Sequence, residues 1–183
     1  MSSWTVRQAA SVVLKGGVIA YPTEAVYGLG CNPYDARAVM RLLQIKQRDI
    51  SRGLILLGRS LADFSDFIVA PDKALRSKLD LTWPGPVTWL LPARDDCPVW
   101  LRGRHTSVAV RVTYHAQSRA LCDQIDSAIV STSANRAGHR PLVTALKVRQ
   151  VFAGELDYIL AGSIGGYAQP SQIRDAVTDT IIR

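Results

Sequence analysis

The sequence has few of the residues that would cross-link a chain or anchor it in a membrane. It holds three cysteines, an odd number without C-x-x-C spacing, so neither a disulfide framework nor a zinc site is expected. Its purely apolar runs, such as residues 54–57, are far shorter than the ~20 residues of a membrane helix. The first residues lack the basic and then apolar segments of a signal peptide. We therefore expect a soluble, reduced protein of the cytoplasm.

Repeats, low-complexity tracts and long linkers are also absent from the sequence. The 183 residues correspond to about one domain at the usual ~100–200 residues per domain. Apolar residues make up 48% and charged residues 20%, an ordinary globular balance that argues against a disordered or fibrous chain. We therefore predict a single globular domain over residues 1–183.

Acidic residues are scarce in three segments, so the net charge of +7 is unevenly distributed. Residues 41–59, 99–120 and 136–150 hold five, four and four basic residues, and among them only one acid, Asp49. This segregation indicates a positive surface or cleft for an anionic partner, either a nucleotide or RNA. The alternative is a basic protein whose arginines are merely solvated.

Short apolar runs alternate along the chain with amphipathic segments. We predict helices over 3–14, 35–45, 61–68, 71–79, 116–125 and 144–152, from apolar residues at a 3–4 spacing. We predict strands over 18–21, 54–57, 87–91, 107–112, 128–131, 157–160 and 177–182. This order is typical of an α/β domain whose sheet is covered by helices on both faces. The short step from 87–91 to 107–112, without a predicted helix, indicates a mixed sheet.

Polar motifs follow several of these strands, at the place where open α/β sheets usually bind ligands. Residues 21–30 read YPTEAVYGLG, in which Gly28 and Gly30 permit close approach of the backbone to a ligand. Thr23 offers a hydroxyl at the end of the strand. The alternative is a plain strand–turn–strand unit in which Thr23 and Glu24 form the turn.

A second candidate is the basic sequence Lys46-Gln-Arg48, which Arg52 follows. If the chain leaves the helix near Ile45 and extends, Lys46 and Arg48 point to the same side. Two cations arranged in this way suit a triphosphate. The alternative is that they only complement the helix dipole. No Walker motif is present.

Arg111 lies within the apolar strand pattern SVAVRV. Because arginine is rarely buried without a partner, it either pairs with an acid or points into a cleft that receives an anion. Few acids are nearby in the sequence, so we favour the cleft. Residues 131–135, STSAN, place three hydroxyls and an amide at a strand end, more than a helix cap requires.

Weaker motifs are WPGPVT at 83–88, a rigid turn in which Thr88 faces a ligand only as a lesser alternative, and PSQIR at 170–174, in a loop. No catalytic triad or nucleophile elbow is evident. The three histidines show no metal-like spacing, and we expect them at the surface or in loops: His105, His115 and His139.

Taken together and in this order, YPTEAVYGLG, KQR, WPGPVT, SVAVRV, STSAN and PSQIRD resemble the bacterial threonylcarbamoyl-AMP synthase family, of the short TsaC (YrdC) type related to Sua5. These motifs span residues 21–175. The resemblance implies a YrdC-like fold, a twisted, open, mixed α/β sheet covered by helices, with a concave basic cleft. It also implies that L-threonine, bicarbonate and ATP give threonylcarbamoyl-AMP and pyrophosphate. That product leads to N6-threonylcarbamoyladenosine (t6A) at position 37 of tRNAs that read codons beginning with A.

The resemblance also implies residue roles. Threonine would be bound by Thr23, Arg111, Ser131 and Ser171. ATP would be bound by Lys46, Arg48, Arg52, Ser107, Ser133, Asn135 and Arg183. Lys46 and Arg48 would stabilise the leaving pyrophosphate and are the candidate catalytic residues. Mg2+ would arrive with ATP and keep several waters, so a protein metal cluster is not expected.

The implied product would pass to the complex that transfers threonylcarbamoyl to tRNA, and tRNA binding by this chain should be weak. Three positions depart from the Sua5 pattern at expected ligand contacts: Leu57 replaces a histidine, Arg52 an asparagine and Pro141 a serine.

Two other functions fit parts of the sequence. A plain RNA-binding module would use the basic segments, with tryptophans stacking on bases, but no RNP, KH or double-stranded-RNA motif appears. Of the four tryptophans in the sequence, Trp83 and Trp89 are expected in the core, which leaves Trp4 and Trp100 to stack on bases. The second alternative function is carbamoyl-adenylate chemistry, as in hydrogenase maturation proteins. In those proteins a domain of this kind is joined to further domains, which argues against this function for a chain of 183 residues.

Overall fold

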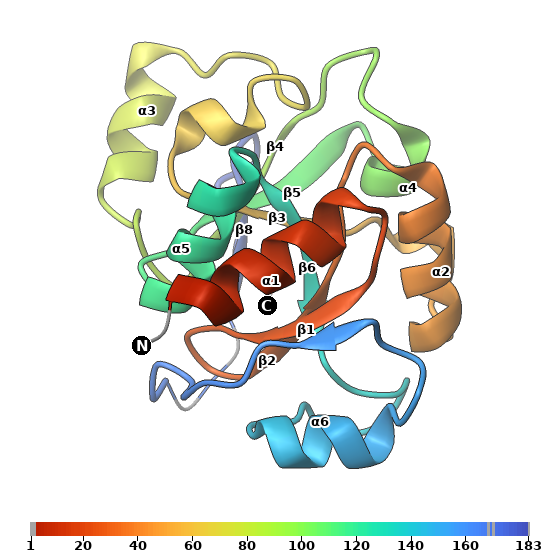
Figure 1. Ribbon diagram of the computed structural model, residues 1–183. Helices are drawn as coiled ribbons and strands as arrows, with labels where there is room; N and C mark the ends of the chain where they lie inside the picture. The colour runs from red at the N-terminus through yellow and green to blue at the C-terminus, as the bar shows by residue number, and fades with distance from the viewer. Residues whose placement is uncertain (1–2, 168, 170, 183) are drawn as a thin grey trace.

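The structure is a computed structural model that describes residues 3–167, 169 and 171–182. Its described strands form one eight-stranded mixed sheet in the order β7-β1-β2-β6-β3-β5-β4-β8 (Figure 1). The strands are β1 Ile19–Pro22, β2 Tyr27–Gly30, β3 Ile55–Gly58, β4 Val87–Pro92, β5 Ser107–Val112, β6 Ile129–Ser133, β7 Tyr158–Ile159 and β8 Gln172–Asp175. The α-helices are α1 Ser3–Leu14, α2 Ala36–Lys46, α3 Lys73–Asp80, α4 Val99–Arg102, α5 Ala116–Ile125 and α6 Ala145–Val151.

The pairing of the strands confirms the mixed sheet. β1 and β2 form an antiparallel hairpin, and β4 lies antiparallel to β5. β3 and β5 run parallel, as do β4 and β8. The step from β4 to β5 does contain a helix, the four-residue α4, contrary to expectation. A single helical turn lacks the apolar periodicity by which longer helices are recognised.

Two helix ends determine how the chain enters and leaves the sheet. The Asp35 carboxylate accepts hydrogen bonds from the backbone N–H groups of Arg37 and Ala38, which caps the start of α2. Gln47 ends this helix in the left-handed region with φ 51°. The chain therefore does not extend after Ile45, and the expected strand-like alignment of the following cations is wrong.

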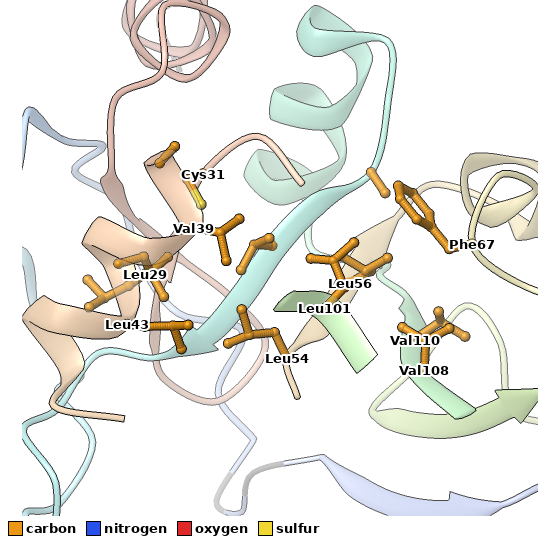
Figure 2. Close-up of a cluster of buried hydrophobic side chains, with 14 of the residues drawn as sticks. Leu29, Cys31, Val39, Leu43, Leu54, Leu56, Phe67, Leu101, Val108 and Val110 are labelled. Atoms are coloured by element: carbon orange, nitrogen blue, oxygen red, sulfur yellow. The ribbon is translucent and has the colours of Figure 1, made fainter. Parts of the chain in front are cut away.

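Apolar side chains fill both faces of the sheet. On one face, Leu57 and Ile129 are fully buried against α1 and α5, which lie side by side across the sheet (Figure 1). On the other face, Leu56 and Val110 join a larger cluster with α2, whose Val39 contributes to it (Figure 2). Burying each large aliphatic side chain contributes roughly 1.5–3 kcal/mol.

The helices leave part of the first face uncovered. Cross-strand partners point to the same side of a sheet, so the pairs Leu57–Arg111 and Ile55–Ala109 share this face. Along β5, Ser107 and Ala109 on this face are half-buried, whereas their neighbours on the other face are buried. The predicted coverage of both faces is therefore incomplete, and the open area lies beside α1 and α5.

Two predicted elements are wrong. Residues 61–68 do not form an α-helix; Leu61–Phe64 is a short 3-10 helix, and the Asp63 side chain turns back to accept from the backbone N–H of Arg59. Residues 177–182 do not form a strand. The sheet ends instead with β8, after which the Asp175 side chain accepts from the next N–H groups and stabilises a turn. Within the described chain, no helix has the length and apolar character needed to traverse a bilayer.

Candidate active site

Thr23 and Ser131 converge on Gly28 from different elements. A Cβ added at Gly28 would lie 3.4 Å from Ser131 Oγ, from Thr23 Cγ2 and from Tyr21 Cζ. Glycine at this position therefore keeps a small space open between the loop after β1 and the middle of β6. The structure thus brings together two of the four residues expected to bind threonine.

Thr23 itself serves the turn between β1 and β2. Both its backbone N–H and its Oγ1 donate to the carbonyl oxygen of Val26, at 3.0 and 2.7 Å. The alternative interpretation of this residue as a turn former is therefore confirmed. Its hydroxyl oxygen keeps lone-pair capacity to accept a further hydrogen bond.

Arg111 has an acidic partner, contrary to the interpretation favoured above. Its Nη2 lies 3.2 Å from Glu24 Oε2, with side chains only 9% and 2% exposed. Thr113 Oγ1 donates to the other oxygen of Glu24, Oε1. Two buried atoms of this pair, Arg111 Nε and Glu24 Oε2, have no hydrogen-bond partner among the described residues. The guanidinium is therefore countered by a charge without being saturated by hydrogen bonds.

Ser171 precedes β8 and is buried beside β4. Thr88 Oγ1 donates to Ser171 Oγ at 2.9 Å. By the register of β4 and β5, Thr88 faces the same side of the sheet as Arg111. Ser171 therefore reaches the neighbourhood of Arg111 through a hydroxyl that the sequence marked only as a lesser candidate.

Lys46 and Asn135 form a second group just beyond the carboxyl end of β6. Lys46 Nζ donates to Asn135 Oδ1 and to the Asn135 carbonyl, both at 2.9 Å, and to the Ser133 carbonyl. Ser133 Oγ donates to Asn135 Oδ1 at 2.6 Å. Burial, and then the neighbouring cations Arg48 and Arg52, lower the pKa of Lys46 to about 8. The end of α2 and the STSAN segment thus meet, although the extended geometry expected for Lys46 is wrong.

The remaining expected ATP residues lie in different settings. Arg48 Nη2 donates to the Gly53 carbonyl at 2.9 Å, and Arg52 is exposed at the end of the 3-10 helix Ile50–Arg52. Ser107 begins β5, on the same face as Arg111. Arg183 lies outside the described residues, so its expected role stays a prediction.

Sequence reasoning missed two residues that hold these groups in place. Glu24 belongs to the motif YPTEAVYGLG, but only its position in the folded chain identifies it as the partner of Arg111. Arg136 pairs with Glu155 and donates to the carbonyl of Ile45 at 2.8 Å, next to Lys46. Its ring contact with Phe152 completes this link between α2, the segment after β6 and the end of α6. The one clue was its place directly after Asn135.

Other sequence expectations fall outside the two groups. His105 and His139 are exposed as expected, and His115 caps α5 by accepting from the N–H of Ser118. Trp89 is buried, and Trp83 packs against the core. The three cysteines are free and buried. Two of the residues that depart from the Sua5 pattern differ in burial. Leu57 is part of the core under α1 and α5, whereas Pro141 is half-buried.

An open mixed sheet with hydroxyls and an arginine on its uncovered face, and with an amide and a lysine beyond the end of β6, is typical of α/β proteins that bind small anions. The model of a family described as "Telomere recombination", which groups Sua5, YciO and YrdC proteins, matches residues 11–183. The chain belongs to this family.

Relatives agree with this assignment. The chain is 51% identical to a threonylcarbamoyl-AMP synthase of Nitrosococcus oceani, over 99% of this chain and 98% of the relative. It is 47% identical to one of Pseudomonas syringae, over 100% and 98%. Among solved structures, P. abyssi Sua5 complexed with L-threonine has a TM-score of 0.89 at 30% identity, and 96% of this chain covers 52% of that one. E. coli YciO has a TM-score of 0.85 at 26% identity, over 100% and 89%.

Proposed function

We propose that this chain is a threonylcarbamoyl-AMP synthase. It joins L-threonine, bicarbonate and ATP to give threonylcarbamoyl-AMP and pyrophosphate, the first step of t6A formation in tRNA. Relatives of nearly equal length with that name support this function. The RNA-binding alternative loses support, since three of the four tryptophans belong to or pack against the core, and Trp4 alone is exposed.

The observation that carries the proposal is that two serine hydroxyls, of Ser131 and Ser133, lie on one side of β6. Ser131 belongs to the group expected to bind threonine, and Ser133 to the group expected to bind ATP. Residues two apart on a strand share a face and lie about 7 Å apart. Two small substrates held by these groups would therefore meet over one short stretch of strand, as a reaction between them requires.

The chemistry follows from the charges in the two groups. Arg111 binds the threonine carboxylate. The threonine amine attacks the carbon of bicarbonate, water leaves, and a carbamate forms. A carbamate oxygen then attacks the α-phosphorus of ATP, and the bond to the β-phosphate breaks to release pyrophosphate. Lys46 and Arg48, with Arg52, neutralise the negative charge that develops on this leaving group.

Mg2+ enters this proposal only as a companion of ATP. No group of three or more His, Cys, Asp or Glu suited to a metal ion occurs among the described residues. The ATP group offers cations together with the Ser133 hydroxyl and the Asn135 amide, which already bond to each other. This donor set does not fit a protein-held metal, so phosphate oxygens and water would supply the ligands.

The setting of the enzyme is part of the same proposal. The uncovered face would form the concave basic cleft. After burial, Arg48 and Arg52 lower the pKa of Lys46, which supports a positive centre at the end of α2. The mixed anhydride product is labile, which favours transfer to the tRNA-modifying complex in the cytoplasm. Binding of tRNA by this chain would be weak and strongly salt-dependent.

The test is to incubate the protein with ATP, threonine and bicarbonate, and to measure both pyrophosphate and the adenylate by mass spectrometry. Pyrophosphate release should require both threonine and bicarbonate and no RNA. Release without threonine, or no adenylate in any mixture, would contradict the proposal. Tight, salt-resistant tRNA binding without pyrophosphate release would favour the RNA-binding module.

A further inference from the structure

Glu24 is a buried carboxylate whose function the reaction above does not yet include. It is 2% exposed, so water screens its charge poorly. Its side chain is held by Thr113 Oγ1, and its carbonyl accepts from the N–H of Tyr167. Gly165 packs so closely that an added Cβ would lie 3.0 Å from Glu24 Cα. The negative charge therefore has a fixed place behind Arg111.

The contact between Glu24 and Arg111 leaves both ions with unused capacity. Nη2 and Oε2 are 3.2 Å apart, yet within the described part of the chain Oε2 accepts no hydrogen bond and Arg111 Nε donates none. A bidentate pair would use both oxygens and two guanidinium nitrogens. Here the guanidinium keeps a donor that the described residues do not use, while the charge of Glu24 lies beside it.

This arrangement distinguishes between ligands that carry the same carboxylate. A simple acid brings one negative charge to Arg111 and meets repulsion from Glu24 a short distance away. An α-amino acid brings a carboxylate for Arg111 and an ammonium whose charge Glu24 attracts. The fixed pair of opposite charges is thus complementary to a zwitterion.

We propose that Glu24 is a specificity-determining residue, which makes the site select ligands with an α-ammonium group over acids without one. This inference rests on the proposed function, since it takes threonine as the ligand of Arg111. Glu24 acts through its charge and through the orientation of Arg111. It is therefore distinct from the residues expected to contact threonine directly.

The test compares threonine with 3-hydroxybutanoate, which lacks only the amino group, by calorimetric titration of the whole protein. Threonine should bind about tenfold to a hundredfold more tightly, the usual effect of one charge-assisted contact. In Glu24→Gln, which keeps the shape of the side chain, the ratio of the two affinities should fall to less than about threefold. In the control Asp63→Asn, which neutralises another buried, ion-paired carboxylate, the ratio should stay unchanged.

Equal binding of the two ligands by the unaltered protein would overturn the inference, as would an unchanged ratio in folded Glu24→Gln. If Glu24→Gln does not fold, Glu24→Asp takes its place; it draws the charge back by one methylene group and should lower the ratio without abolishing it. An unchanged ratio in Glu24→Asp would then overturn the inference. Failure of threonine to bind at all would contradict the proposed function, whereas binding without preference would contradict only the role of Glu24.

Discussion

Lys46 Nζ donates to Asn135 Oδ1 at 2.9 Å and thereby joins the end of α2 to the segment that follows β6. Oxygens of the STSAN segment accept hydrogen bonds from the ammonium group, and Lys46 as a whole residue is only 5% exposed. A triphosphate that binds Lys46 must therefore share or replace one of these acceptors. The protein oxygens hold the cation in position before the nucleotide arrives.

The first prediction concerns the pH dependence of ATP binding. Burial and neighbouring cations lower the pKa of Lys46 to about 8, so the free protein loses this positive charge as the pH rises through 8. ATP affinity should therefore decrease between pH 7.5 and 9.5, measured by calorimetry without threonine or bicarbonate to exclude their own titration. Lys46→Arg keeps its charge in this range and should show no such decrease. An equal decrease in both proteins would contradict the assignment.

Arg111→Lys should weaken threonine binding and spare ATP binding. Lysine keeps the positive charge beside Glu24 but lacks the planar fork that matches a carboxylate. We expect about a tenfold loss of threonine affinity, the equivalent of one charge-assisted hydrogen bond. Titration with each substrate separately measures this, and a matching loss of ATP affinity would show that the change is not local.

Arg136→Met should weaken ATP binding although Arg136 belongs to neither group of expected ligands. Its guanidinium holds the carbonyl of Ile45, next to Lys46, and pairs with Glu155. We expect ATP affinity to fall about threefold to tenfold, because the change reaches ATP only through the position of Lys46, with threonine affinity unchanged. Arg149→Met, at an exposed arginine of α6, is the matched control. Unaltered ATP affinity in Arg136→Met would leave the arginine a purely structural role.

Removal of residues 179–183 should cost little stability. Had 177–182 formed a strand, its loss would have been severe, but the structure shows an isolated bridge between Arg174 and Ile181. Among its described residues, two backbone hydrogen bonds join this segment to the rest, from Ile182 N to Ile173 O and from Asp175 N to Thr180 O, together with an exposed ion pair between Lys78 and Asp179. We expect a loss of about 1–2 kcal/mol in the free energy of unfolding. Denaturant titration measures it, and a loss above about 4 kcal/mol would contradict this account.

The sequence predicted the fold well wherever apolar periodicity was strong. Residues 107–112 and 116–125 coincide with β5 and α5, because six or more patterned residues leave little ambiguity. Short or half-buried elements were harder to predict from the sequence. The four residues of β8 are all half-buried, so their sequence lacks the apolar pattern of a strand, and they were predicted to be part of a loop. The apolar Val177 and Ile182 suggested a strand that does not form.

The candidate site was predicted as a set of motifs but not as a set of contacts. Arg111 was expected to lack an acid because proximity was judged along the sequence, whereas Glu24 comes from a distant turn that the sheet brings close. The segregation of charge was likewise judged along the sequence. Arg41, Arg59 and Arg136 belong to the basic segments, yet each pairs in space with carboxylates from elsewhere.

Because Ser131 and Ser133 share one side of β6, a slip of that strand by one residue would turn both hydroxyls into the opposite layer of the protein at once. A misaligned molecule could not lose one substrate and keep the other. β6 is paired on both sides, with β2 and β3, and it buries Ile129 and Val130 in opposite layers, so its register is strongly specified. The packing that holds the core together therefore also places both hydroxyls.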